Sequence, residues 1–307
     1  MISIVISSAT FSIAIVSNAI NSSAIISSTA IDIMKRSSLR CAAVAICVSA
    51  TLAGCETVNT TQPGAIGVDR KQVMSPLVSE QELRQGAVTA YKEVLTKEQS
   101  KGALNADGAL TNRVRAISKR VIPATAAFRS DAPGWAWEVN VIKSDQLNAW
   151  CMPGGKIAFY SGIIEKLQLN DDEIAAIMGH EIAHALREHG RERASEGAIS
   201  QLGIAVVTTA AGGGKAAADM AQVAYGLAFS LPHSRLHETE ADRIGVELSA
   251  RSGYDPRAAI GLWQKMAKIS GGKGPEFLSS HPSSDSRIKD LTDYAARVMP
   301  LYEKARH

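Results

Sequence analysis

Two histidines one helical turn apart constrain this 307-residue chain more than any other feature of its sequence. They are His180 and His184, in the segment Gly-His-Glu-Ile-Ala-His, with Glu181 between them. On a helix, residues four positions apart share a face, so both imidazole rings can reach one metal ion. Glu181 lies about 100° further round the helix than His180, toward the water that such an ion activates. This spacing predicts a helix that holds a catalytic zinc ion, an arrangement suited to the hydrolysis of a peptide bond.

The residues before the motif predict where this helix begins and that it is buried. Asn170 is a good N-cap residue, and Glu173, three positions later, completes a capping box. Asp171 and Asp172 place negative charge in the first turn, where the helix dipole favours it. The side chains that follow are mostly Ile, Ala, Met and Leu, so we expect a core helix with its polar residues directed inward. Buried His and Glu need partners, and a cation supplies one.

A second segment, residues 234–245, offers a further metal ligand. Glu238 and Asp242 lie one helical turn apart in it. One of these carboxylates can bind the metal while the other accepts the second ring N–H of a ligand histidine. Two histidines and one glutamate, with a fourth position left open, form a known catalytic zinc set. Glu240 and His237 are competing ligands, although Glu240 lies about 200° from Glu238 around the helix.

Four separate blocks of the sequence resemble one protein family. The blocks are residues 148–157, 179–184, 238–242 and 280–288, and they stand in the family's order between Ser79 and the C-terminus. They resemble the zinc metallopeptidases that include the CAAX prenyl proteases, HtpX and the periplasmic BepA- and LoiP-like proteases. The resemblance implies an α+β fold: a mainly helical zincin domain of the gluzincin type, with a small β-sheet or hairpin beside the HExxH helix.

The same resemblance implies a role for each residue of the motifs. It implies one Zn²⁺ per chain, held by His180, His184 and Glu238. Glu181 is then the general base, and Asp242 supports a ligand histidine from outside the coordination sphere.

The segments before the motif predict the sheet. Residues 137–142 alternate as a strand does, residues 156–160 are rich in strand formers, and residues 153–155, Pro-Gly-Gly, mark a turn. An extended peptide could add to the free edge of such a sheet through backbone hydrogen bonds. Most of its side chains belong to the core. In the resembling family an Asn at the position of Asn148 approaches the substrate, which implies a role in binding or in oxyanion stabilisation.

His281 is a further candidate for the site. It follows residues 270–275, a Gly-rich stretch that predicts a loop, and it precedes a helix that opens near Asp285 or Ser286. A single histidine on a loop is ordinarily a surface residue. In the resembling family a His-Pro at this place lies over the metal, where it either stabilises the oxyanion or occupies the open coordination position.

The N-terminal region predicts an export signal and a lipid anchor. Residues 1–33 lack the positive start of a signal peptide, and we interpret them as upstream sequence read from too early a start codon; a weak hydrophobic anchor is the alternative. Residues 34–54 begin Met-Lys-Arg, continue with an apolar stretch and end Leu-Ala-Gly before Cys55, which resembles a bacterial lipobox. An ordinary signal peptide leaves that cysteine unexplained. Glu56, in place of the Asp that retains many such lipoproteins at the inner membrane, favours the outer membrane.

The remaining organisation is simple. Residues 55–78 are interpreted as a tether and residues 79–307 as the metallopeptidase domain. Removal of residues 1–54, which carry three bases and one acid, changes the net charge from +3 to +3 − (3 − 1) = +1. Such a charge gives no reason to expect a nucleic acid partner. Cys151 is the one cysteine left besides Cys55, and we interpret it as a small buried side chain.

Two segments rich in Ala, Gly and Val, residues 197–211 and 216–231, could be mistaken for membrane spans. Both are too short, and Gln201, Asp219 and Gln222 interrupt them. We expect a buried helical hairpin.

These patterns predict a zinc metalloendopeptidase that is lipid-anchored at the periplasmic face of a bacterial envelope. Its substrates would be unfolded or misfolded envelope or outer-membrane proteins. A second hypothesis is a non-proteolytic chaperone or assembly lipoprotein with a structural or quiescent zinc, and a third is a protease dedicated to one substrate. Glu181 separates the first two hypotheses, because holding a protein needs no general base.

Overall fold

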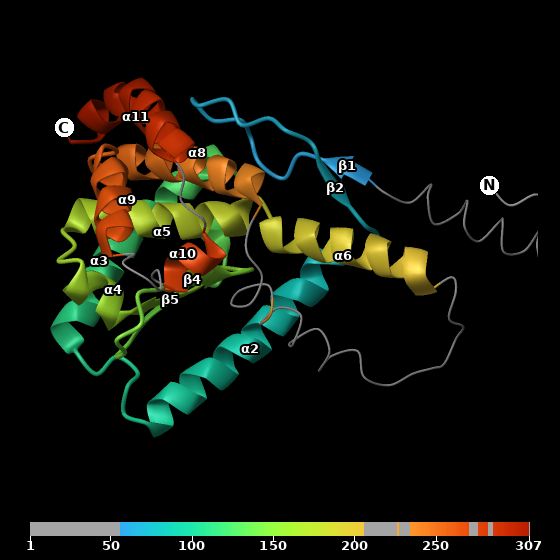
Figure 1. Cartoon of the computed structure of the whole chain (residues 1–307), viewed down its shortest axis with the longest axis horizontal. Helices are drawn as coiled ribbons and strands as arrows, with labels where there is room; N and C mark the ends of the chain where they lie inside the picture. The colour runs from blue at the N-terminus through green and yellow to red at the C-terminus, as the bar shows by residue number, and fades with distance from the viewer. Residues whose placement is uncertain (1–55, 206–225, 227–233, 270–275, 282–284, 307) are drawn as a thin grey trace, which may run out of the picture. The chain divides into compact units, whose positions relative to one another are not determined.

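The motif helix is a core element of the structure, a computed structural model that describes residues 56–205, 226, 234–269, 276–281 and 285–306 (Figure 1). Helix α5 (Asp171–Leu186) is buried without interruption from Glu173 to its end. Its predicted capping box is confirmed. The Asn170 side chain accepts a hydrogen bond from the Glu173 backbone N–H at 2.9 Å, and the Glu173 carboxylate accepts one from the Asn170 N–H at 3.0 Å. The local sequence therefore fixes where the motif begins its helix.

Helices surround α5 and build most of the core. Helix α8 (Arg235–Arg251) packs along α5, and α11 (Asp285–Ala305) packs on α8. Helices α3 (Gly108–Ala124) and α9 (Ala258–Ile269) also contact α5 (Figure 1). The prediction of a mainly helical α+β fold is confirmed. The other described helices are α2 (Glu80–Ser100), α4 (Ser161–Lys166), α6 (His189–Ala205) and α10 (Glu276–Ser280), with short 3₁₀ turns at Thr125–Ala127 and Ala132–Gly134.

Two glycines allow α5 and α8 to cross closely. A Cβ atom on Gly179 would lie 2.7 Å from the carbonyl oxygen of Gly245, and a Cβ on Gly245 would lie 2.8 Å from the backbone nitrogen of His180. These neighbours are backbone atoms, so a side chain at either position would force the helices apart. The glycines thereby bring the polar positions of α5 and α8 within reach of one another.

A three-stranded sheet lies beside the motif helix. Its order is β3 (Glu138–Ile142), β5 (Lys156–Tyr160), β4 (Ala149–Met152); β3 and β5 are parallel, and β4 is antiparallel to β5. The predicted turn at residues 153–155 joins β4 to β5, and both of its glycines have positive φ. The sequence predicted β3 and β5 but not β4, the strand that contacts α5.

Residues 55–78 are interpreted from the sequence as a tether, but residues 56–74 of this segment form a strand pair and pack on the domain. Strands β1 (Glu56–Val58) and β2 (Gln72–Met74) pair antiparallel, and the loop between them is packed on the domain. The backbone N–H groups of Ala65 and Ile66 donate to the buried carboxylate of Glu247 at 2.8 and 3.1 Å. Threonine, proline and glycine suit a turn-rich packed segment as well as a linker, because side chains elsewhere can satisfy its backbone. We call residues 56–74 the strap.

Several predictions fall on residues outside the described ranges. They concern residues 1–33, the signal peptide at 34–54 and the lipid on Cys55. Most of the expected hairpin of residues 197–231 also lies outside, since α6 is described to Ala205. Among the helices that the structure does describe, none combines the length and apolar character needed to cross a membrane.

Candidate metal centre

Four buried side chains meet where α5 faces α8: His180, His184, Glu238 and His281. One nitrogen or oxygen atom of each lies within 4.8 Å of the others. Nε2 of His180 is 3.1 Å from Nε2 of His184 and 3.2 Å from Nδ1 of His281. Oε1 of Glu238 is 3.4 Å from Nε2 of His184 and 2.9 Å from Nδ1 of His281. Atoms that bind one tetrahedral ion at about 2.0–2.1 Å lie roughly 3.3 Å apart, so these spacings suit a single ion.

Asp242 orients the first histidine. Nδ1 of His180 lies 3.0 Å from Oδ1 of Asp242. Arg287 donates to both carboxylate oxygens of Asp242 at 2.7 Å, and its third nitrogen is 2.8 Å from Oε2 of Glu238. Burial raises the pKa of Asp242, but the charges and hydrogen bonds of Arg287 and His180 together outweigh it and lower that pKa overall. The ionised carboxylate accepts a hydrogen bond from the Nδ1–H of His180, which leaves Nε2 with a lone pair.

A second imidazole orients the other histidine. Nδ1 of His184 is 2.9 Å from Nδ1 of His189, whose Nε2 is 3.0 Å from Oε2 of Glu240. Burial lowers the pKa of His189 to about 3, so this ring is neutral and carries one proton. Glu240 can only accept, so the proton is on Nε2 of His189, and Nδ1 of His189 accepts from His184. The Nε2 atom of His184 is therefore also left with a lone pair.

These two orientations show that the residues fit a metal ion. The Nε2 atoms of His180 and His184 lie 3.1 Å apart, and both are acceptors, so neither can donate to the other. Their lone pairs repel unless a cation lies between them. Burial and the neighbouring imidazoles lower the pKa of His184, which keeps the ring in the neutral form that a metal requires.

Glu181 borders the centre without belonging to the four-residue cluster. Its Oε1 atom lies 3.5 Å from Nε2 of His281. Burial raises the pKa of Glu181, although the nearby imidazoles of His281 and His180 and a backbone hydrogen bond from Cys151 oppose this effect. A carboxylate with a raised pKa is better matched to accepting and returning a proton near neutral pH.

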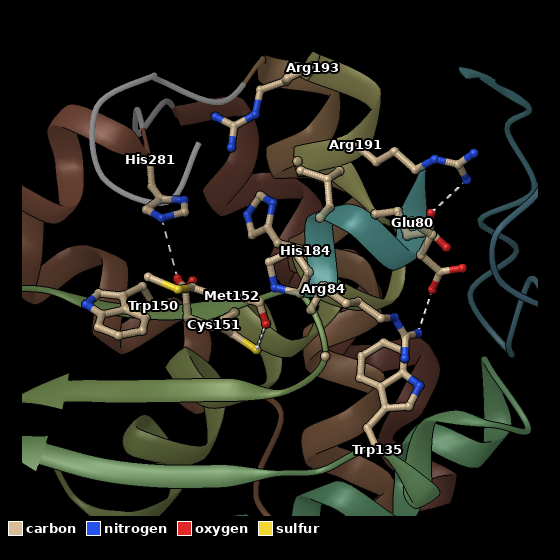
Figure 2. A pocket seen from close by; sticks show the side chains of 17 residues that line it. Glu80, Arg84, Trp135, Trp150, Cys151, Met152, His184, Arg191, Arg193 and His281 are labelled. Carbon is tan, nitrogen blue, oxygen red and sulfur yellow. Dashed lines mark hydrogen bonds and ion pairs between the residues drawn. The ribbon is translucent and has the colours of Figure 1, made fainter. Parts of the chain in front are cut away.

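A cleft leads away from the centre along β4 (Figure 2). Glu181, His184 and His281 line it at the centre, and Trp135 and Arg84 line it elsewhere. Cys151 was expected to be buried, but it is partly exposed and belongs to the cleft wall. The other lining residues that Figure 2 labels are Glu80, Trp150, Met152, Arg191 and Arg193.

Asn148 and the alternative ligands lie apart from the cluster. Asn148 is buried just before β4, where its side-chain oxygen accepts from the backbone N–H of Ala149 at 2.9 Å; it is not among the described residues that line the cleft. Glu240 contacts His189 instead of the cluster, and Nε2 of His237 lies 3.1 Å from a carboxylate oxygen of Glu192. The structure thus brings together Glu238, and neither alternative, with the motif histidines.

Sequence reasoning missed two residues that support the centre. Arg287 lies in one of the resembling blocks, but no spacing rule connects it to Asp242, 45 positions earlier. His189 stands five positions after His184, one more than the spacing that marks a shared helix face. It reaches His184 because α5 ends at Leu186 and α6 begins a new direction at His189. A third histidine so near the motif was the one available signal.

Comparison with known proteins agrees with this centre. A buried His-His-Glu cluster with a glutamate beside it, on a mainly helical domain, is the arrangement of a metallopeptidase. The model of peptidase family M48 matches residues 109–295, and the chain belongs to that family. Members of this family use a divalent metal ion.

Several curated relatives match over part of their length. The mitochondrial metalloendopeptidase OMA1 of Arabidopsis thaliana is 36% identical over 176 residues, which are 56% of this chain and 34% of that protein. The protein of the same name from Schizosaccharomyces pombe is 33% identical, over 68% of this chain and 59% of its own length. The beta-barrel assembly-enhancing protease of Escherichia coli K12 is 26% identical, over 64% and 41% respectively. The chain therefore spans between a third and three fifths of these three relatives.

Replacement of Glu238 by Gln tests the ligand assignment. The variant should lose metal affinity by more than the roughly 10–100-fold that loss of a supporting residue costs. Metal content after dialysis, measured by atomic emission, checks this. His237→Gln, one position away on α8, is the matched control and should keep its metal. Retention of metal by Glu238→Gln together with loss by His237→Gln would overturn the assignment.

Proposed function

We propose that the chain is a zinc metalloendopeptidase. The observation that carries this proposal is the position of Glu181, which borders both the donor set for a metal and the cleft beside β4. Bound zinc would polarise the scissile carbonyl and lower the pKa of water. Glu181 takes the proton of the attacking water and passes it to the leaving amine. His180, His184 and Glu238 hold the metal, and Asp242 keeps His180 in the tautomer that binds.

We further propose that the substrates are unfolded or misfolded proteins of the bacterial envelope. Strand β4 pairs with β5 alone among the described strands, so an extended peptide can add to its other edge. Recognition through backbone hydrogen bonds needs an extended chain and little sequence preference, which suits an unfolded substrate. The name of the Escherichia coli relative, a beta-barrel assembly-enhancing protease, supports an envelope substrate.

Glu181→Gln separates a protease from a chaperone. We expect cleavage of an unfolded protein to fall by about 10²–10⁴-fold, because the general base is lost, while metal content stays at the wild-type level. Expressed in the native envelope, the variant should retain substrates that can be identified by mass spectrometry. The matched control is Glu188→Gln, a carboxylate that also lines the cleft but takes no part in the metal centre. A wild-type protein that holds unfolded substrates equally well and never cleaves them would favour the chaperone.

We also propose that His281 occupies the fourth coordination position in the resting enzyme. Its Nδ1 atom is 2.9 Å from a ligand oxygen of Glu238 and 3.2 Å from a ligand nitrogen of His180. These spacings are close to those of atoms that bind one tetrahedral ion, which supports His281 as a fourth ligand. Substrate must then displace His281 before cleavage.

His281→Ala should therefore raise basal cleavage of an unfolded protein. The removed imidazole frees a coordination position, and the three remaining ligands suffice to hold the metal. Initial rates of cleavage, with zinc content measured in parallel, check this expectation. If His281 instead donated to the oxyanion, the same variant would lose about 10²–10³-fold in turnover with full zinc content, and the resting-state proposal would fail.

We propose that the chain is located at the outer membrane, anchored through lipid on Cys55. The lipobox-like end of residues 34–54 supports this, whereas the OMA1 relatives carry mitochondrial names. Cys55→Ser should leave an unprocessed precursor, and translation should start at Met34. Mass spectrometry of the mature N-terminus from fractionated envelopes is the measurement. An unmodified Cys55 within a longer mature chain would contradict the anchor.

A further inference from the structure

The strap reaches the metal centre from outside the segment that the M48 model matches. Arg70, near the C-terminal end of the strap, hydrogen-bonds to two buried carboxylates on different helices. It donates to Oε1 and Oε2 of Glu240 on α8 at 2.6 and 3.1 Å. It also donates to Oε1 and Oε2 of Glu192 on α6 at 2.6 and 2.9 Å. A planar guanidinium with several fixed donors is the side chain that can hold two carboxylates at once.

Glu240 connects Arg70 to a ligand of the metal. The Nε2–H of His189 donates to Oε2 of Glu240, and the Nδ1–H of His184 donates to Nδ1 of His189. Arg70 thus begins a chain of hydrogen bonds that ends on the imidazole whose Nε2 faces the metal. The carboxylate of Glu240 can only accept, so Nε2 of His189 donates to it and Nδ1 of His189 is the acceptor for His184.

Contacts close to Arg70 also hold the strap against the domain. The Gln72 side chain donates to the backbone carbonyl of Arg187 and to Glu192, both at 2.7 Å. Arg187, which is fully buried at the end of α5, donates in return to the backbone carbonyl of Arg70 at 3.0 Å. The position of Arg70 is therefore fixed by the fold and does not depend on a mobile surface side chain.

Electrostatics explains why this contact matters to the centre. Glu192 and Glu240 are 4% and 3% exposed, so removal of Arg70 takes from each buried carboxylate a cation that is hydrogen-bonded to both of its oxygens. Glu240 would then keep a hydrogen bond of 3.1 Å from Arg187 and one of 3.0 Å from His189. A carboxylate that moves toward Arg187 or toward water no longer holds the Nε2–H of His189. The tautomer and the orientation of His184 then lose their support.

The same arrangement argues against a second metal ion nearby. His189, Glu192 and His237 lie close enough together to suggest a metal site. However, Arg70 occupies both oxygens of Glu192, and the rings of His189 and His237 are stacked with centroids 4.3 Å apart. Parallel rings do not direct their nitrogens toward a common point, and a cation would have to displace an arginine.

We propose that Arg70 is a positioning residue of the metal centre and that the strap, through Glu240 and His189, sets the affinity of His184 for the metal. The strap, which follows the predicted lipid anchor, then contributes to metal binding. Displacement of the strap would weaken metal binding without any change in the ligands themselves.

The test compares zinc dissociation constants of the full-length protein, measured by competition with a chromophoric chelator. Arg70→Gln should raise the dissociation constant by about 10–100-fold, the range for loss of a supporting residue, and should still bind one zinc at saturation. Glu247→Gln is the matched control. It loosens the strap at Ala65 and Ile66, away from the hydrogen-bond chain, so its dissociation constant should stay within about twofold of wild type. An equal rise in both variants would mean general destabilisation and would overturn the proposal.

A double-mutant cycle tests whether Arg70 acts through Glu240. Glu240→Gln alone should raise the dissociation constant, and the addition of Arg70→Gln should change it by less than about twofold more. If the two substitutions together raised the dissociation constant by the product of their separate effects, the proposed route through Glu240 would be overturned. An unchanged dissociation constant in Arg70→Gln would also overturn it. Should Arg70→Gln fail to fold, Arg70→Lys gives the same comparison, because lysine keeps the cation but cannot fork to both carboxylates. Zinc binding is read without any cleavage, so the outcome is independent of the proposed peptidase activity.

Discussion

The close crossing of α5 and α8 is the constraint on which the rest of the site depends. Gly179 and Gly245 meet at this crossing with no room for a Cβ atom, one residue before the first motif histidine. The helices consequently face each other with His180 and His184 on one side and Glu238 and Asp242 on the other. A crossing of ordinary distance would leave the nitrogens and the carboxylate too far apart to share one ion.

Both motif histidines are supported in the same way, although by different elements. The Nδ1–H of His180 meets a carboxylate, Asp242, that an arginine of α11 clamps with two hydrogen bonds. The Nδ1–H of His184 meets a carboxylate through one intervening imidazole, and that carboxylate is clamped by Arg70 of the strap and by Arg187, the residue after α5. In each case a buried charge is compensated by a buried charge of opposite sign, which keeps the acceptor ionised at the cost of desolvation.

The sequence predicted those parts of the site that follow from local spacing. Helical periodicity identified His180 and His184, and the capping box of Asn170 and Glu173 located the start of their helix. Spacing alone left open which of Glu238 and Asp242 binds the metal and which accepts from a ligand histidine. In the structure Asp242 contacts Nδ1 of His180. Strand β4 was missed because its four residues do not alternate: three are buried and only Cys151 is partly exposed. His189 and Arg70 were missed because their contacts depend on a turn between helices and on long-range packing, which no local pattern encodes.

The strap shows why composition alone misled for residues 56–74. A linker and a packed segment can share the same turn-forming residues. They differ in whether their backbone polar groups and charged side chains find partners in the domain. Here Glu247 binds two backbone N–H groups of the strap, and Arg70 donates hydrogen bonds to two buried carboxylates, Glu192 and Glu240. Its partners, Glu192 and Glu240, lie 122 and 170 positions away, so the need for a cation at position 70 becomes visible only once α6 and α8 have been brought together. The metal centre is therefore assembled from both ends of the described chain, with Arg70 acting on one histidine and Arg287 on the other.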